Sequence, residues 1–461
     1  MNIRKYKGER GSVLVMAVVL SFAMVLLGLS YLGFVNRVMM ETEEMLADEQ
    51  HRFARYAGIM TADLYARIST PGSNYHGGVT EFYDGVYYDS HILFSGFEGG
   101  FYRTDANYTL VGTGIVRRHS GVNRQSESYR SIKLETFADY LYLSDIERDL
   151  VRNVIIRFWT PDTLDGKVHS NDTLHVMGSP RFMKKVTTGA IIEPPNNNAR
   201  FDESYDLNAR KIIFPEQADS IRFYTGYHGW GTSDPDSATE ITFSGHNIYR
   251  RYCGLYINPP DTIIQCFPPF IASAPVFPIP RSGALFIEGK VYIKANRAGV
   301  DLMDGNFRSI GYEGRLTVAS SDTMIIYDNL IYRYANPDNS VPETIAEIRD
   351  VLGLISENFI MVGDSVDDVV YINAAMAALN GSISVQDIYD YWVDNEKQSL
   401  FIYGSLAQKY RGIVHTTDYG DRGFIEKDYH YDKRLRQYPP PHFIPTGNNK
   451  AIYSEAFFDE G

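Results

Sequence analysis

The chain has 461 residues, of which 44% are hydrophobic and 22% are charged, and its formal net charge at pH 7 is −13. This hydrophobic fraction suffices for a packed core, and the length fits one large domain or two medium ones. The acidic balance argues against nucleic-acid binding, which needs a basic surface. The 34 tyrosines, 25 phenylalanines and 38 glycines favour strands and tight turns over helices.

An uncharged run, residues 11–35, is the most informative segment, because it is long enough to cross a bilayer as one helix. Basic residues precede the run and acidic residues follow it, which predicts a cytoplasmic N-terminus. A cleaved secretory signal is the alternative, but the run exceeds the ~7–15 apolar residues of such signals and no small-x-small site follows. We therefore predict a single-pass anchor that includes Ser12, Val13, Leu14, Val15, Met16, Leu20, Phe22, Leu26, Leu29 and Phe34.

The helix is predicted to continue beyond the membrane. Apolar residues recur at helical spacings at Leu46, Phe53, Ala57, Met60, Leu64 and Ile68. The first proline is Pro71, and the residue before a proline disfavours the helical conformation. A helix over Ser12–Ser69 would be roughly 85–90 Å long. Its second half would be amphipathic and would form a coiled coil or pack as a core helix.

The segment Arg10-Gly11-Ser12-Val13-Leu14-Val15 resembles the start of type IV pilin-like proteins, and most closely the PilX-type N-terminal family of minor pilins and pilus assembly proteins. The resemblance implies that a prepilin peptidase cuts after Gly11, so that Ser12 becomes the first mature residue. Major pilins usually begin with Phe and carry Glu at the fifth position, where this chain has Ser12 and Met16. These departures favour a minor, tip-located or priming subunit over a repeating one; an uncleaved anchor is the alternative.

The remainder of the chain is predicted to be β-rich, since short alternating or β-branched runs are separated by turn residues. Helices are expected only at Pro342–Leu352 and Ser384–Asn395, with Ala138–Asn153 as a third candidate. A Gly-x-aliphatic strand followed by a polar Ser/Asn/Asp corner recurs weakly, for example at residues 166–176 and 289–326. Stacked units of this kind predict a parallel β-helix, with a β-sandwich of hairpins as the alternative.

The predicted organisation has five parts. They are a basic leader (1–11), a pilin-like transmembrane plus amphipathic helix (12–70), a β-rich lead-in (71–160), a β-helix-like body (161–445) with a Pro-rich insertion at about 190–280, and a C-terminal tail (446–461).

The two cysteines, Cys253 and Cys266, flank Pro259-Pro260. A hairpin folded about these prolines would place the cysteines opposite each other, within the ~3.5–4.5 Å between Cβ atoms that a disulfide needs. An exported protein can hold such a pair oxidised, so we predict a disulfide; two buried free thiols are the alternative.

A second resemblance covers residues of about 130–445. The segments 165–171, 178–182, 404–412 and 427–435 are similar to a bacterial family known as domain of unknown function family 4900. Members of this family commonly carry a pilin-like N-terminus, so the resemblance implies an exported, pilus-associated protein. The family has no established activity, so it implies no catalytic residue.

Three groups of residues carry side chains that could take part in chemistry. His169 and His175 are too few for a metal site and are better explained as polar residues at a corner. The acidic loops Asp364–Asp368 and Asp234–Ser237 lack a defined calcium motif, so calcium is a low-weight possibility and solvated turns are favoured. Asp428–Arg434 suits either a catalytic cleft, as in β-helix polysaccharide lyases, or a cap over the last repeat, and the prolines that follow it favour the cap.

From these observations we expect a non-enzymatic pilin-like component of a type IV pilus or a related secretion pseudopilus. It would sit in the bacterial inner membrane with its body in the periplasm or at the cell surface. Its partners would be other pilins or assembly proteins, and it would need neither nucleic acid nor a cofactor. The alternatives are a membrane-tethered module that binds surface polysaccharide, and a carbohydrate-active enzyme, since fold alone does not define function.

Overall fold

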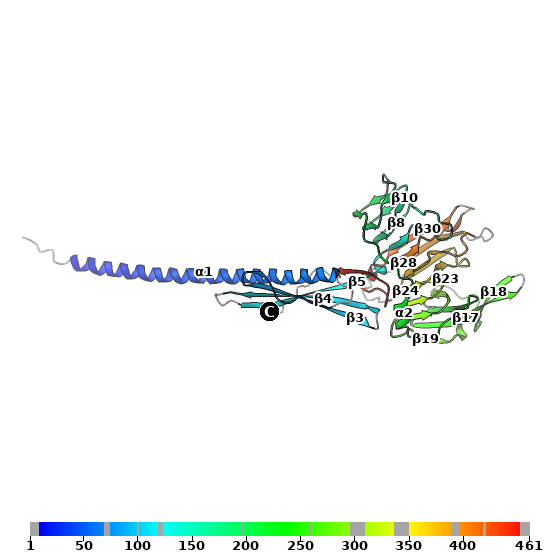
Figure 1. The fold of residues 1–461 in the computed structure, drawn as a ribbon, viewed down its shortest axis with the longest axis horizontal. Helices are drawn as coiled ribbons and strands as arrows, with labels where there is room; N and C mark the ends of the chain where they lie inside the picture. The colour runs from blue at the N-terminus through cyan, green and yellow to red at the C-terminus, as the bar shows by residue number, and fades with distance from the viewer. Residues whose placement is uncertain are drawn as a thin grey trace, which may run out of the picture. The chain divides into compact units, whose positions relative to one another are not determined.

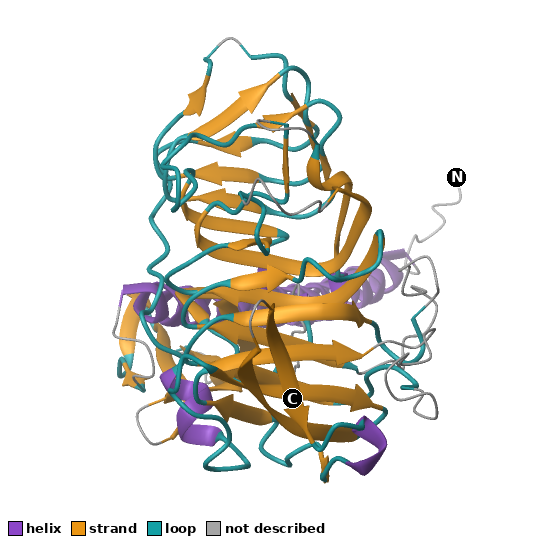
Figure 2. Cartoon of the chain, turned by 90° about the vertical axis from the view of Figure 1, so that its right-hand side faces the viewer, coloured by secondary structure: helices purple, strands orange, loops and turns teal. Residues whose placement is uncertain are grey.

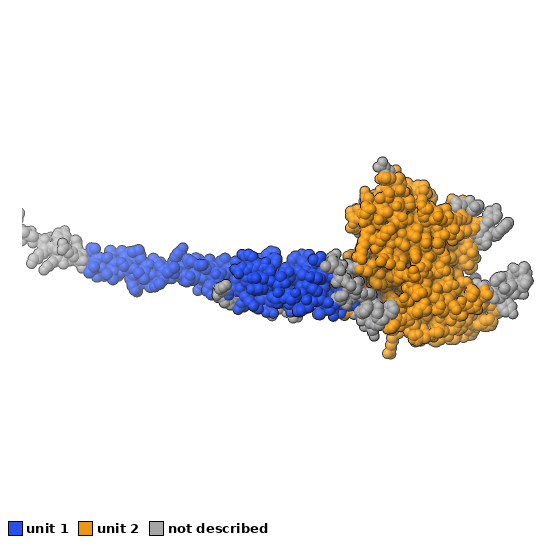
Figure 3. Space-filling model, viewed as in Figure 1, with its two compact units in different colours: residues 1–94, 108–131, 453–461 blue, residues 95–107, 132–452 orange. Residues whose placement is uncertain are grey.

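The computed structural model describes residues 9–68, 74–98, 101–118, 123–195, 197–258, 261–295, 309–335, 350–389, 396–417 and 421–451. The protein is mainly β, with one long N-terminal helix (Figure 1). Its described residues divide into two compact units (Figure 3). Unit 1 holds those of Met1–Phe94 and Tyr108–Ser131, and unit 2 holds those of Ser95–Asn107 and Ile132–Ile452.

Unit 1 consists of the long helix and an antiparallel sheet. Its elements are α1 (Glu9–Ile68), β1 (Tyr75–His76), β2 (Thr80–Tyr83), most of β3 (Val86–Glu98) and β4 (Phe101–Arg117), and the first part of β5 (Asn123–Thr136). The strand order is β1-β3-β4-β5, and β2 also pairs with β3. The second half of α1 runs beside β3 and β4 (Figure 1). The predicted long helix is confirmed: it begins at Glu9 and its last described residue is Ile68, close to the expected end.

The first part of unit 2 is a set of short parallel strands. They are β6 (Tyr142–Ile146), β7 (Phe158–Trp159), β8 (Thr163–Leu164), β9 (Val168–Ser170), β10 (Leu174–Met177), β11 (Arg181–Phe182), β12 (Val186–Thr188), β13 (Ile192–Glu193), β14 (Arg200–Phe201) and β15 (Tyr205–Asp206). Three ladders, β7-β10-β13, β8-β11-β14 and β9-β12-β15, contain three parallel strands each. Val168, for example, pairs with Val186 and Val186 with Tyr205. Each step along a ladder is 18 or 19 residues, so three strands recur together at one period.

The later part of unit 2 contains both parallel and antiparallel strands. They are β16 (Ser237–Ser244), β17 (Asn247–Asn258), β18 (Asp261–Phe267), β19 (Val276–Pro278), β20 (Ala284–Ile287), β21 (Lys290–Ala295), β22 (Arg315–Ser320), β23 (Met324–Leu330), β24 (Val351–Ser356), β25 (Ile360–Val362), β26 (Val369–Ala378), β27 (Ile383–Val385), β28 (Glu396–Tyr410), β29 (His415–Thr416), β30 (Arg422–Tyr431) and β31 (Pro445–Ala451). Short helices lie at α2 (Asp219–Tyr224), η1 (Phe137–Asp139), η2 (Ile271–Ser273) and η3 (Lys433–Arg436). One parallel ladder follows β20-β22-β24-β26-β28 and a second follows β21-β23-β25-β27. Figure 2 shows these strands lying one above another.

The parallel register places similar residues next to one another on adjacent strands, and the aliphatic ones form the core of unit 2. In the second ladder Val291 pairs with Met324, Met324 with Ile360, and Ile360 with Ile383. Burying such a column of aliphatic side chains contributes about 1.5–3 kcal/mol per side chain before the entropy of ordering is subtracted. The column joins one large buried aliphatic cluster that also includes Leu316, Leu352 and Ile372.

Polar residues stack in the same way at the corners. Ser320 pairs with Ser356 on the adjacent strand, and the Ser356 hydroxyl donates to the Asp322 carbonyl at 2.8 Å. The Ser144 hydroxyl donates to Ser170 Oγ at 2.9 Å. The predicted pattern of short strands and polar corners is therefore present, and the corner side chains bind the backbone of the turns.

None of the three expected helices is present in the described part of the chain. Ala138–Asn153 contains η1 and then β6, which pairs in parallel with both β9 and β28. Leu352 lies in β24 and Ser384 in β27, while residues 336–349 and 390–395 lie outside the described part of the chain. Pairing with strands distant in sequence outweighs local helical preference at these positions.

The predicted disulfide is present. Cys253 on β17 is paired with Cys266 on β18, and their sulfur atoms are bonded. The turn predicted at Pro259-Pro260 falls outside the described residues, and the antiparallel register of β17 and β18 is the expected one.

Candidate functional site

The first half of α1 has no packing partner in the described structure. Every side chain from Ser12 to Phe34 is exposed, including all ten predicted anchor residues. A helix that is apolar on all faces and unburied by protein is suited to lipid. By length and composition α1 is therefore a candidate membrane span. Gly11 and Ser12 lie in its first turn, and cleavage between them stays a prediction.

The second half of α1 packs on the sheet of unit 1 mainly through small residues. The buried positions are Ala47, His51, Ala54, Gly58, Ile59, Ala62, Asp63 and Ala66. A Cβ placed on Gly58 would lie 2.6 Å from the Asp89 carbonyl oxygen. A Cβ on Gly112 of β4 would lie 2.3 Å from the Arg55 carbonyl oxygen. Helix and strand backbones thus touch directly, which only glycine permits at these two positions.

The apolar stripe of this half is exposed, contrary to the core-helix interpretation. The exposed fractions are 58% for Met39, 51% for Leu46, 53% for Phe53, 42% for Met60 and 56% for Leu64. Residues seven apart lie on one face of a helix, and each successive residue is rotated by about 100°. The sheet-facing Ala47 and Ala54 follow stripe residues directly and so occupy another face. The helix buries mostly small side chains, together with Ile59, against the sheet, and the large apolar side chains of the stripe point outward.

Polar bonds fasten α1 to β4 and β5. His51 Nε2 lies 3.0 Å from the Gly114 carbonyl oxygen and 3.3 Å from Ser126 Oγ. Arg124 Nε donates to Asp48 Oδ1 at 2.9 Å, an exposed pair of small energetic value. The buried His51 bond is the stronger constraint on how the helix is rotated against the sheet.

The two histidines that the sequence singled out are separate in the structure. His169 is buried on β9, where its ring nitrogens contact Thr187 Oγ1 at 2.7 Å and Asn171 Oδ1 at 3.0 Å. His175 lies on β10 and its Nδ1 is 3.4 Å from Glu193 Oε2. Burial lowers the pKa of both imidazoles. Their partners are Asn171, which directly follows β9, and side chains of the neighbouring strands β12 and β13.

The two acidic loops are held by different hydrogen bonds, through a side chain at Asp234 and through a backbone carbonyl at Asp368. Asp234 closes its own turn, accepting from the Asp236 N–H at 3.1 Å and from the Ser237 hydroxyl at 3.0 Å. At the other loop, the Asp368 carbonyl accepts two backbone N–H groups from β28. Calcium at either loop stays a prediction of low weight.

The segment Asp428–Arg434 is saturated with ion pairs. His430 contacts Asp165 Oδ2 at 3.1 Å and Asp428 Oδ1 at 3.0 Å, and these two carboxylates raise its pKa to about 10. Asp432 is fully buried, caps η3 and binds the Arg434 guanidinium through both oxygens. Side chains committed to such bonds hold the chain in place and are poorly suited to exchanging protons with a substrate.

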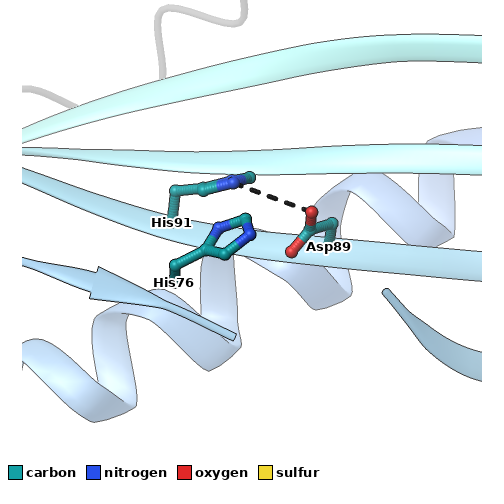
Figure 4. A group of neighbouring side chains, drawn as sticks. All are labelled: His76, Asp89 and His91. Atoms are coloured by element: carbon teal, nitrogen blue, oxygen red, sulfur yellow. Dashed lines mark ion pairs between the residues drawn. The ribbon is translucent and has the colours of Figure 1, made fainter. Parts of the chain in front are cut away.

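One cluster escaped the sequence analysis. His76 of β1 and Asp89 and His91 of β3 bring their ligand-type atoms within 4.8 Å of one another (Figure 4). The only available signal was an Asp-x-His alternation preceded by a histidine 13 residues before the aspartate, which is weak without the strand register. A second group, Glu240 with Cys253 and Cys266, has its sulfur atoms committed to the disulfide.

Glu240 has a different role beside the disulfide. The Arg251 guanidinium donates to both of its carboxylate oxygens, at 2.7 and 2.6 Å, and both side chains are nearly buried. This bidentate pair sits on β16 and β17 and supports the hairpin that carries Cys253.

Comparison with known proteins adds no relative. No family model, no curated protein and no solved structure matches this chain.

Proposed function

We propose that this protein is a non-enzymatic pilin-like component of a type IV pilus or related secretion pseudopilus, anchored in the bacterial inner membrane with its body exported. The observation that carries the proposal is the exposed apolar stripe of α1. It extends the apolar surface of the N-terminal half of the helix along the half that packs on the sheet. Soluble folds rarely leave such a continuous apolar strip uncovered.

The geometry of the stripe suits the helix of another pilin-like chain. Met39, Leu46, Phe53 and Met60 are spaced by seven residues, which is the repeat that lets two helices pack side by side. The sheet occupies another face of α1 through Ala47, Ala54 and Gly58, so a partner helix would not compete with it. One face would hold the exported domain and the other would hold the filament.

We further propose that unit 2 is a parallel β-helix. A coiled chain in which each turn lies on the previous one must show the same residue offset in all its ladders. The three early ladders all advance by 18 or 19 residues per strand. Later, Leu285 pairs with Val318 and Val291 with Met324, so both ladders advance by 33 residues together. A sandwich of hairpins would be mainly antiparallel.

In this arrangement Asp428–Arg434 does not cap the stack, contrary to the expectation from the prolines that follow it. β30 pairs in parallel with β28, and β6 links β28 to β9. His430 contacts Asp165 of the early part of unit 2, so the segment lies between the early and later strands.

One observation favours the alternative of a tethered module that binds surface polysaccharide. Tyr252 and Phe267 are directly opposed on β17 and β18 and are 45% and 59% exposed, with Phe270 close by in sequence and 51% exposed. Exposed aromatic rings offer faces against which sugar rings can pack. Loss of glycan binding in Tyr252→Ala and Phe267→Ala, with assembly intact, would favour this alternative.

The decisive test is the N-terminus of the protein extracted from its native membrane, measured by intact mass and terminal peptide. A start at Ser12 supports prepilin processing, and an intact Met1 argues for a simple anchor.

A matched pair of variants then tests the stripe. Phe53→Gln changes the stripe, whereas Met45→Gln changes an equally apolar side chain, 74% exposed, that lies off it. We expect Phe53→Gln alone to reduce cross-linking to partner pilins. Equal effects of the two variants would contradict the role of the stripe.

A further inference from the structure

His76, Asp89 and His91 share one face of the sheet in unit 1. His76 on β1 is directly opposite His91 on β3 in the antiparallel register, so their side chains project to the same side. Asp89 lies two residues before His91 on the same strand and therefore projects there too. Figure 4 shows the two imidazoles side by side with the carboxylate next to His91.

This face is the one turned away from α1. Val86 and Tyr88 of β3 belong to the cluster that packs with Ala47 and Ala54 of the helix, and alternation puts Asp89 and His91 on the other side. The His91 and Asp89 side chains are 28% and 13% exposed, and His76 is exposed. The cluster is thus open enough for an ion to enter.

The distances suit a small divalent ion. The imidazole centroids are 4.0 Å apart, and His91 Nε2 is 3.7 Å from Asp89 Oδ2. Ligand atoms around a tetrahedral zinc ion, each at ~2.0–2.2 Å, lie about 3.4 Å from one another. Because the ligand-type atoms all lie within 4.8 Å of one another, small rotations of the side chains would bring them to this spacing. Two imidazoles and a carboxylate form a donor set typical of zinc, with water in the fourth position.

The carboxylate is also held in place. The Ser90 N–H donates to Asp89 Oδ1 at 2.7 Å, which leaves Oδ2 directed at His91. Such an outer hydrogen bond orients a metal-ligating carboxylate.

We propose that His76, Asp89 and His91 bind one zinc-type divalent ion that clips β1 to β3. β1 has only two residues, so few backbone bonds hold it to the sheet. An ion joining residues 76 and 91 would close the intervening chain as a loop and oppose the opening of this edge. The inference is independent of the pilin proposal, because it concerns the domain and not the outward stripe.

The test uses the full chain in detergent, stripped with chelator and titrated with Zn²⁺ by calorimetry. We expect one site, and at least 10-fold weaker binding in each of His76→Ala and His91→Ala. The matched control is His228→Ala, which removes an exposed histidine of unit 2 and should leave the affinity unchanged. A second readout is hydrogen exchange at residues 75–76, which Zn²⁺ should slow in the wild type and in His228→Ala only.

Three results would overturn the proposal. They are no Zn²⁺ binding by the wild type, binding that persists unchanged in His76→Ala and His91→Ala, and binding that leaves exchange at residues 75–76 unaltered. Unfolding curves recorded without metal test whether the variants are folded. Because both histidines are partly or fully exposed, each variant should unfold like the wild type.

Discussion

Replacing Gly112 by alanine should separate α1 from the sheet of unit 1. The added Cβ would lie 2.3 Å from the Arg55 carbonyl oxygen, 2.6 Å from the Ile59 nitrogen and 2.8 Å from Ile59 Cγ1. Ordinary contact begins near 3.4 Å, so the helix must retreat by about 1 Å because backbone atoms cannot rotate away. Overpacking costs about 1–3 kcal/mol, and a backbone clash belongs in the upper half, about 2–3 kcal/mol.

Hydrogen exchange of the α1 amides over residues 47–66, followed by mass spectrometry in detergent, measures this loss locally. A cost of about 2–3 kcal/mol corresponds to exchange about 30- to 150-fold faster. Gly254→Ala is the matched control, because its strand position has nothing within 4 Å of the new Cβ; its effect should stay within about 0.5 kcal/mol. Unchanged exchange in Gly112→Ala, or equal changes in both variants, would refute the close backbone packing.

Two further predictions concern charges in unit 2. Glu147→Gln should lower the free energy of unfolding, measured with denaturant, by about 3–5 kcal/mol. The reason is that Arg411 Nη1 donates to the buried Glu147 Oε2 at 2.7 Å and would lose its counter-charge. Asp202→Asn breaks the more exposed pair with Arg181 and should cost far less, so equal losses in the two variants would contradict this prediction. His430 has its pKa raised to about 10 by Asp165 and Asp428. Its stabilisation is therefore complete below its ordinary pKa of about 6.5 and declines as the pH rises through about 10. Urea midpoints of wild type and His430→Gln should differ most near pH 6 and converge by about pH 10, and a gap independent of pH would argue against the ion pairs.

Local patterns determined several features of this protein without any structure. The uncharged run at residues 11–35 predicted the candidate membrane span at the start of α1. The absence of proline before Pro71 predicted that the helix continues, and it is described as far as Ile68. The two prolines between the cysteines predicted a hairpin, and Cys253 is indeed opposite Cys266 in the register of β17 and β18. Each of these depends on residues near one another in sequence, where backbone preference and spacing act directly.

Tertiary structure decided which side of α1 is buried. The apolar spacing of Leu46, Phe53 and Met60 predicted a helix face that packs in a coiled coil or in a core, yet the sheet covers the face that holds Ala47, Ala54 and Gly58. Glycines on β4, distant in sequence, make the close approach possible, and no pattern within the helix reveals them. Likewise β6 is a strand because β9 and β28 pair with it, and His76 meets His91 because β1 folds back onto β3. Contacts between distant segments set these outcomes, because the free energy of pairing and close packing exceeds the small intrinsic preferences that a local sequence expresses.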